Sequence, residues 1–480
     1  MTLDLDQEEM RRLGYMVTDV VAEHLASLRE QPAQRATSRE EAEKLIAGPP
    51  PEEGSDFEKI LATLRERVFP YHAREPHPRF LGYIPSCPTY PAVLGDWLAT
   101  GYNFFAGVWP VATGPNEVEL VVLDWFRQWL GMPKGTRGLL TTGGSAATLT
   151  AVVAARHGRT GGRSDSISKL VIYASDQAHS SVARAAWMAG LDRENVRTIA
   201  TDASYRMRLD ALEDAIRADR KKGLEPLMVV ANAGTTSTGA VDPLPDIADL
   251  CGHEGIWLHV DAAFAGFASL TERGKKALSG IQRADSVTLD PHKWLFVPFE
   301  CGCLLVRDPK TLESAFRIMP EFLKDVQEGH EQVNFADLGE QLTRYSRALK
   351  IWVGVHYHGL AAIHDALERG MRLAEYFEAC LRKRGGFEIL SSAQFGILCF
   401  RLKPNGVDTA ELNGINQRAN AYVNATGRYL ISSTSLKGIF SLRVCTHSFR
   451  TTERDLDELA DLIVEAARSS AAPAPGVSHY

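Results

Sequence analysis

The sequence predicts an α/β protein built on a mainly parallel sheet, with helices before the sheet and a smaller α+β domain after it. In the middle of the chain, short apolar runs alternate with longer helical patterns, and polar residues follow the runs. The runs lie at residues 139–140, 170–173, 227–230, 256–260 and 287–289. Continuous apolar runs separated by helices are typical of parallel strands covered on both faces. Such sheets bind ligands beyond the carboxyl ends of their strands, where these polar residues fall.

Two amphipathic helices are expected before the sheet, at residues 7–30 and 57–68, with Pro49-Pro50-Pro51 between them. Neither has a core nearby in the sequence, so they are expected to pack on another part of the fold or on a second subunit. Strand-like runs at 395–402, 429–435 and 440–445 indicate the smaller domain. The predicted parts are an N-terminal helical segment at 1–88, a large domain at 89–364, a small domain at 365–468 and a disordered tail at 469–480.

Composition narrows the class of protein. The chain has 480 residues, of which 45% are hydrophobic and 24% charged, which is ordinary for a soluble globular protein. A net charge of −7 argues against a nucleic-acid or anionic-membrane surface. Seven scattered cysteines show no zinc or disulfide spacing, and no apolar run reaches the length of a membrane span. With an acidic start and no apolar signal segment, a cytoplasmic location is expected.

Lys293 follows a predicted strand and stands between two aromatic rings, His292 and Trp294. Its neighbourhood alone favours a packed lysine whose ammonium reaches solvent. The other interpretation is a lysine that bonds to a carbonyl cofactor. That role needs partial desolvation, which lowers the pKa of the ammonium and exposes a neutral amine.

Asp261 directly follows the apolar run at 256–260 and precedes Ala262 and Ala263. A carboxylate at the end of a buried strand needs a cationic partner, unless it caps the following helix. A protonated pyridine nitrogen is such a partner, and the carboxylate would keep that ring able to accept electrons from a substrate Cα.

Three further signals follow predicted strands. Residues 142–148 form a glycine-containing turn before a helix, which suits a phosphate but resembles ordinary turns. His179, among small residues, can stack on a flat ring, and Thr236 can hydrogen-bond near it. Taken singly, each is better read as structural. Together, the phosphate turn, the histidine, Asp261 and Lys293 occur in an order that predicts a pyridoxal-phosphate site.

The sequence resembles the group II pyridoxal-phosphate decarboxylases, whose best-known members act on aromatic L-amino acids. The matching stretches lie at 78–83, 142–148, 175–182, 234–236, 259–263 and 291–294. The similarity runs from the first predicted helix to the last, and the motifs around His179 and Lys293 are highly specific. The resemblance implies a PLP-dependent transferase fold of the aspartate aminotransferase type I. It also implies an obligate homodimer with active sites at the interface, in which the N-terminal segment wraps the partner.

Matching motifs imply roles for individual residues. Lys293 forms a Schiff base with pyridoxal 5'-phosphate, Asp261 pairs with the pyridine nitrogen, and His179 stacks on the ring. Thr236 supports His179 and the substrate carboxylate. The phosphate is assigned to Gly144, Ser145 and His292, and the aromatic pocket for the substrate to Tyr83 with Phe105 or Trp109.

The implied activity is decarboxylation of an aromatic L-amino acid (Trp, Tyr, Phe or DOPA) to the arylalkylamine and CO2. Family decarboxylases commonly use a loop tyrosine to help protonate Cα. Counting back from the well-matched residues 342–352 places Phe335 there, and phenylalanine has no proton to give. In relatives with that change, the carbanion can react with oxygen to give an aldehyde, ammonia and peroxide. Either another group or water protonates Cα, or the product is an arylacetaldehyde.

Three other interpretations fit the sequence less well. No extra basic residue is assigned to a distal carboxylate, which disfavours an acidic substrate, and a histidine substrate is also disfavoured. An aminotransferase usually needs a dedicated arginine for the α-carboxylate, and no motif identifies one. An inactive cofactor-binding protein would not need Lys293, Asp261 and His179 intact.

Overall fold

The computed structural model describes residues 3–164, 166–318 and 332–468. The predicted tail at 469–480 and most of the loop before Phe335 lie outside the described residues. The chain divides into two compact units. The sheet unit contains Ser86–Glu375 and Ser391–Cys399, and the terminal unit contains Met1–Pro85, Tyr376–Leu390 and Phe400–Tyr480. The division falls near the predicted boundary at 88. The second division falls between Glu375 and Tyr376, inside helix α13 (Ala348–Arg384), and the predicted boundary at 364 lies in the same helix.

The sheet unit is built on a seven-stranded sheet with the order β1-β7-β6-β5-β4-β2-β3. Neighbours from β3 to β6 pair in parallel, and β7 runs antiparallel to both β6 and β1. The predicted mainly parallel sheet is therefore confirmed. Its strands are β1 (Arg137–Thr141), β2 (Leu170–Ser175), β3 (Val196–Ile199), β4 (Glu225–Asn232), β5 (Trp257–Asp261), β6 (Ser286–Leu289) and β7 (Gly302–Val306).

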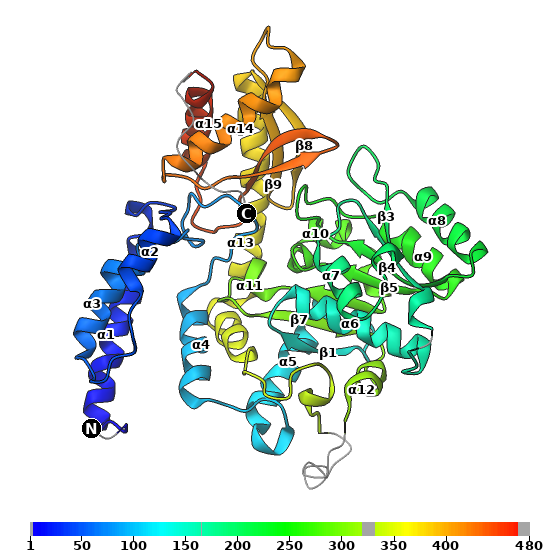
Figure 1. Ribbon diagram of the computed structural model, residues 1–480, viewed down its shortest axis with the longest axis horizontal. Helices are drawn as coiled ribbons and strands as arrows, with labels where there is room; N and C mark the ends of the chain where they lie inside the picture. Colours follow the sequence, from blue (N-terminus) through cyan, green and yellow to red (C-terminus); the bar gives the residue numbers. More distant parts are fainter. Residues whose placement is uncertain (1–2, 165, 319–331, 469–480) are drawn as a thin grey trace. The chain divides into compact units, whose positions relative to one another are not determined.

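Burial explains which strands the sequence predicted. All six residues of β2 and seven of eight in β4 are buried, so both faces of the sheet are covered. β3 is half exposed and carries no continuous apolar run, which is why the sequence did not predict it. Figure 1 shows helices around the sheet. They are α4 (Tyr90–Tyr102), α5 (Thr113–Trp129), α6 (Gly144–Thr160), α7 (Ser181–Met188), α8 (Leu209–Lys221), α9 (Leu244–Glu254), α10 (Glu272–Ala277), α11 (Pro291–Trp294) and α12 (Lys310–Phe316).

The register of the central strands places their carboxyl ends at one level. Asn232 at the end of β4 pairs with Asp261 at the end of β5, and Asp261 pairs with Thr288 of β6. Because these strands are parallel, the segments that follow them leave the sheet at the same edge. This edge brings together residues that lie up to 150 positions apart in the sequence, from about 142 to 293.

The terminal unit joins the N-terminal helices to the C-terminal residues. Arg29 and Arg79 both donate to the buried carboxylate of Asp455, at 2.8 and 3.0 Å, and tie the N-terminal segment to α15. Its helices are α1 (Gln7–Ala26), α2 (Arg39–Ile46), α3 (Phe57–Arg67), α14 (Thr409–Ala425) and α15 (Glu453–Arg468). A second sheet has the order β10-β11-β9-β8, with strands β8 (Phe387–Gln394), β9 (Ile397–Leu402), β10 (Ser432–Leu436) and β11 (Ile439–Cys445).

Two features of the N-terminal helices bear on the sequence predictions. Helix α2 was not predicted, although Ser38 and Glu41 form a capping box that marks its start. Helix α1 buries none of its side chains, and Met10, Tyr15 and Val17 are 52%, 67% and 37% exposed. Within the described ranges, no helix is long and apolar enough to span a bilayer.

His259 gives the sheet a measurable dependence on pH. The ring is fully buried on β5, with Nδ1 2.7 Å from Ser286 Oγ and Nε2 3.2 Å from Thr288 Oγ1. Burial lowers the pKa of His259 to about 4, whereas the unfolded chain takes up the proton near the ordinary value of about 6.5. The unfolded state therefore binds more protons in this window, and the free energy of unfolding falls as the pH drops from about 6.5 to about 4.

We expect His259→Gln to remove this contribution. The stability advantage of the wild type over the variant should shrink by up to roughly 3 kcal/mol between pH 7 and pH 4. Denaturant unfolding at several pH values measures the difference, and His253→Gln, at an exposed ring, is the control. A wild-type advantage that stays constant across this range would contradict the prediction.

Candidate active site

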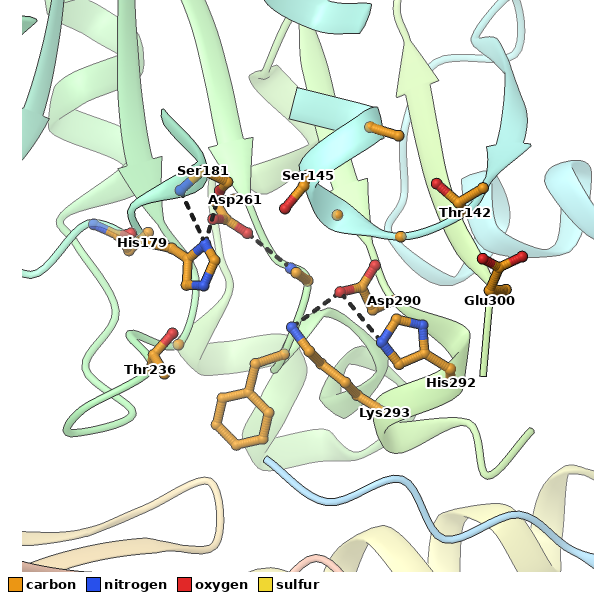
Figure 2. Close-up of a pocket in the computed structure, with 17 residues that line it drawn as sticks. Thr142, Ser145, His179, Ser181, Thr236, Asp261, Asp290, His292, Lys293 and Glu300 are labelled. Atoms are coloured by element: carbon orange, nitrogen blue, oxygen red, sulfur yellow. Dashed lines mark hydrogen bonds and ion pairs between the residues drawn. The ribbon is translucent and has the colours of Figure 1, made fainter. Parts of the chain in front are cut away.

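A cavity of about 380 Å³ lies at the carboxyl edge of the sheet (Figure 2). Seven residues that the sequence predicted to bind the cofactor line this one cavity: Gly144, Ser145, His179, Thr236, Asp261, His292 and Lys293. They come from the segments that follow five different strands. The strand-end pattern in the sequence thus corresponds to a single site in the structure.

The turn between β1 and α6 forms one wall of the cavity. Helix α6 starts at Gly144, and no side chain of the described residues caps its N-terminus. A Cβ on Gly144 would lie 3.0 Å from Asp290 Oδ2, and a Cβ on Gly302 would lie 2.5 Å from the backbone of Gly143. Glycine at these positions lets the helix N-terminus, Asp290 and β7 approach closely. Uncapped N–H groups and the helix dipole make this wall suitable for a phosphate.

His179 is held by the residue that starts α7. Its Nδ1 accepts the backbone N–H of Ser181 at 3.2 Å and lies 2.8 Å from Ser181 Oγ. Because Nδ1 is an acceptor, the neutral ring carries its proton on Nε2. Figure 2 shows the ring between Ser181 and Thr236, with its face open to the cavity.

Asp261 is the last residue of β5 and lines the cavity. Its Oδ1 accepts the backbone N–H of Ala263 at 3.1 Å. The neighbouring strand end carries Asn232, whose amide donates to Asp242 Oδ2 at 2.9 Å and to Ser175 Oγ at 3.1 Å. Asn232 also lines the cavity and was not predicted. It follows the apolar run at 227–230, so the strand-end rule applied to Asp261 would have found it.

Lys293 lies on α11 with its Nζ 2.9 Å from Asp290 Oδ2 (Figure 2). Burial would lower the pKa of Lys293, but the charge and hydrogen bond of Asp290, together with the charge of Asp261, outweigh it and raise the pKa. The sequence indicated that a Schiff-base lysine here would need partial desolvation to lower its pKa. That desolvation is present, but the carboxylate three positions earlier on the chain opposes its effect on the pKa.

The ring of His292 is fixed by a hydrogen bond from one of its nitrogens to the backbone. Nδ1 donates to the carbonyl of Cys301 at 2.7 Å, and Nε2 lies 3.8 Å from Asp290 Oδ2. Burial lowers the pKa of His292, so the ring is neutral near pH 7. Another cavity residue, Glu300, was not predicted and adopts a left-handed backbone conformation with φ of 55°. Its side chain adds a carboxylate to the cavity.

The residues predicted for the substrate's aromatic pocket lie elsewhere. Phe105 and Trp109 share a region with Phe335, since Ala336 N donates to Gly107 O and Trp109 N to Asn334 Oδ1, both at 2.9 Å. Phe335 is fully buried beneath the Arg344 guanidinium, 4.7 Å from its Cζ. Tyr83 belongs to the terminal unit and is 66% exposed. Among the described residues, none of these four lines the cofactor cavity.

The residues of the cavity fit pyridoxal phosphate. The uncapped α6 N-terminus suits the phosphate, Asp261 suits the pyridine nitrogen, and Lys293 and His179 line the same cavity. The chain belongs to the family of the pyridoxal-dependent decarboxylase conserved domain, whose model matches residues 40–403. It is a pyridoxal-phosphate-dependent carboxy-lyase.

Similar proteins cover almost the whole chain. The aromatic-L-amino-acid decarboxylase of Bacillus atrophaeus is 39% identical over 95% of this chain and 94% of its own. The structure of Oryza sativa TDC with PLP and tryptamine has a TM-score of 0.93 and 28% identity, covering 97% and 99% of the two chains. Rhodiola rosea 4-hydroxyphenylacetaldehyde synthase has a TM-score of 0.90 and 27% identity, covering 98% and 100%. The predicted fold is thereby confirmed.

The close approach of Gly302 to Gly143 can be tested by substitution. In Gly302→Ala, the added Cβ would meet backbone atoms of Gly143 at 2.5 Å and displace the phosphate wall. We expect the dissociation constant for pyridoxal phosphate to rise roughly tenfold, because overpacking typically costs about 1–3 kcal/mol. Titration of the apoenzyme, followed by absorbance, measures it. Gly135→Ala is the control, since a Cβ there meets nothing within 4 Å. Unchanged affinity in a folded Gly302→Ala protein would refute the close-approach argument.

Proposed function

We propose that the chain decarboxylates an aromatic L-amino acid to the arylalkylamine and CO2. The observation that carries the proposal is the convergence of Lys293, Asp261 and His179 on one cavity. The substrate class is supported by the Bacillus atrophaeus aromatic-L-amino-acid decarboxylase, which matches nearly the full chain at 39% identity. The seven cysteines, all of which lie within the described residues, form no disulfide, which supports a cytoplasmic location.

Each residue has a task in this proposal. Pyridoxal phosphate supplies an electron-accepting ring for the electron pair left when CO2 departs. Asp261 would keep a proton on the nitrogen of that ring, because its carboxylate lies at the end of a buried strand. Lys293 would hold the cofactor through Nζ, and His179, whose Nε2–H is directed away from Ser181, would contact the cofactor ring from its side of the cavity. Gly144, Ser145 and His292 would serve the phosphate, and Thr236, which lies near His179 in Figure 2, would support that histidine and the substrate carboxylate.

A second candidate is oxidative deamination to an arylacetaldehyde. Phe335 favours it, because a phenylalanine cannot protonate the substrate Cα. The similarity to Rhodiola rosea 4-hydroxyphenylacetaldehyde synthase adds support. In the single chain, however, Phe335 is buried against Arg344 and does not line the cavity, so amine formation would take its Cα proton from another group or from water. The 39% identical relative is a decarboxylase, and we therefore place amine formation first.

Product analysis separates the two candidates. With phenylalanine, tyrosine, tryptophan and DOPA in turn, we expect amine and CO2 in equal amounts and little peroxide or ammonia. Lys293→Ala should abolish turnover, since no other residue is assigned to carry the cofactor. Stoichiometric aldehyde, ammonia and peroxide would reject amine formation in favour of the second candidate. In that case Phe335→Tyr should shift the product towards amine, whereas Phe335→Leu, which adds no hydroxyl, should not.

We also propose a homodimer with active sites at its interface. Helix α1 leaves Met10, Tyr15 and Val17 exposed and buries no side chain. Apolar faces of this kind mark contact surfaces. The predicted aromatic residues Phe105 and Trp109 do not line the cofactor cavity of their own chain, as an interface site would require.

Sedimentation measures the assembly directly. We expect the wild type to sediment as two 52.8 kDa chains. Met10→Glu combined with Val17→Glu, seven residues apart on one face of α1, should shift it towards monomer, because two charges would have to be buried at the interface. Arg11→Glu, which changes charge on the same helix without touching an apolar residue, should leave the dimer intact. A wild type that sediments as a 52.8 kDa monomer would exclude the proposal.

A further inference from the structure

Asp290 is a buried carboxylate between the phosphate wall and the cofactor lysine. It follows β6, precedes α11 and is 3% exposed. Its side chain forms no helix-capping hydrogen bond. Both carboxylate oxygens lie against the first turn of α6, since a Cβ on Gly144 would stand 3.0 and 3.3 Å from them. Asp290 therefore belongs to the cavity without being required to start the helix that follows it.

The two carboxylate oxygens of Asp290 differ in their partners. Oδ2 lies 2.9 Å from Lys293 Nζ. Oδ1 is buried and accepts no hydrogen bond from the described residues. A buried carboxylate is costly unless a cation compensates it. His292 does not do so, because its ring is neutral and Nε2 is 3.8 Å away. In the part of the chain that the structure describes, Lys293 is the cation in contact with Asp290.

Other ionisable groups around the pair come from several elements. Asp261 ends β5, and its charge also acts on Lys293. Lys350 on α13 is already paired with Asp96 at 2.8 Å. The remaining ionisable groups that line the cavity are His179 and Glu300. Among the described residues, none of these groups forms an ion pair with Lys293 as Asp290 does.

We propose that Asp290 is a positioning residue for Lys293, holding its free amine as an ammonium and exchanging one proton with it. The amine of Lys293 is free before it bonds to the cofactor, and again in each cycle when the substrate's amine takes its place. To bond again it has to be a neutral nucleophile. Transfer of one proton from Nζ to Oδ2 leaves an amine beside a carboxyl, so the cavity gains no net charge. The inference rests on the proposed Schiff-base role of Lys293.

Two opposing influences act on the ammonium of Lys293, and they set the direction in which a change at Asp290 shifts its protonation. Burial disfavours the ammonium, while Asp290 favours it through its charge and a hydrogen bond. When Asp290 becomes asparagine, burial is opposed mainly by the more remote Asp261. The fraction of neutral amine at a given pH then increases. Loss of a charge-assisted hydrogen bond is large enough to change that fraction on the order of tenfold.

Competitive labelling of the full-length apoenzyme with acetic anhydride tests the proposal without substrate or turnover. The peptide that carries Lys293 is quantified by mass spectrometry from pH 6 to pH 11, with the exposed Lys276 as internal reference. At pH 8 we expect Asp290→Asn to increase labelling of Lys293 on the order of tenfold and to move the midpoint to lower pH. Asp290→Ser removes the carboxylate with a smaller side chain and should act in the same direction.

Asp261→Asn is the matched control, because it removes the other carboxylate that acts on Lys293. We expect it to move the midpoint less than Asp290→Asn does. An unchanged midpoint in both Asp290 variants, or an equal shift in Asp261→Asn, would overturn the proposal. The inference assumes that Lys293 carries the cofactor, and borohydride reduction of the wild-type holoenzyme tests this assumption separately. If the cofactor is then attached to a residue other than Lys293, the proposed function fails at that point, whatever the labelling shows.

Discussion

The site depends on one constraint of a buried parallel sheet, which is that polar groups have to lie at the ends of its strands. Strands β2 and β4 are buried almost throughout, so a charge in their interior would be uncompensated. The register puts Asn232, Asp261 and Thr288 at one level, and the segments that follow carry the histidines and the lysine. Because a single edge collects these groups, neighbouring strand ends in the sheet become neighbouring groups in the cavity.

A buried ion pair holds the phosphate wall to the rest of the sheet unit. Arg344 and Glu119 are both 1% exposed and lie 2.7 Å apart. Glu119 accepts the N–H of Leu140 on β1 at 2.8 Å, and Arg344 donates to the carbonyl of the same residue at 2.7 Å. Removing one member of such a pair leaves a buried charge and typically costs about 3–5 kcal/mol. The strand that leads into the phosphate wall is thus fixed by the arginine that also covers Phe335.

The sequence predicted those parts of the site that depend on local patterns. Lys293, Asp261, His179 and the turn at Gly144 each follow a buried run, and strand ends are visible without knowing the pairing. Asn232 and Asp290 are also strand-end residues. They were passed over because they lie just before the matching stretches at 234–236 and 291–294. Gly302 and Glu300 could not be found, since their roles come from β7 lying against the phosphate wall. That approach is set by antiparallel pairing between residues 161 positions apart (302 − 141).

The charge balance of the cavity favours the N-terminus of α6 as the place for the proposed phosphate. Three carboxylates line the cavity, Asp261, Asp290 and Glu300, and Lys293 is already engaged with one of them. A dianionic phosphate in such a cavity cannot rely on that lysine for neutralisation. The N-terminus of α6 supplies N–H groups and a dipole that do not titrate. Asp290 lies within reach of both that helix end and Lys293. Glycine at 144 then serves the electrostatics as well as the packing, because any side chain there would separate Asp290 from the helix end that offsets its charge.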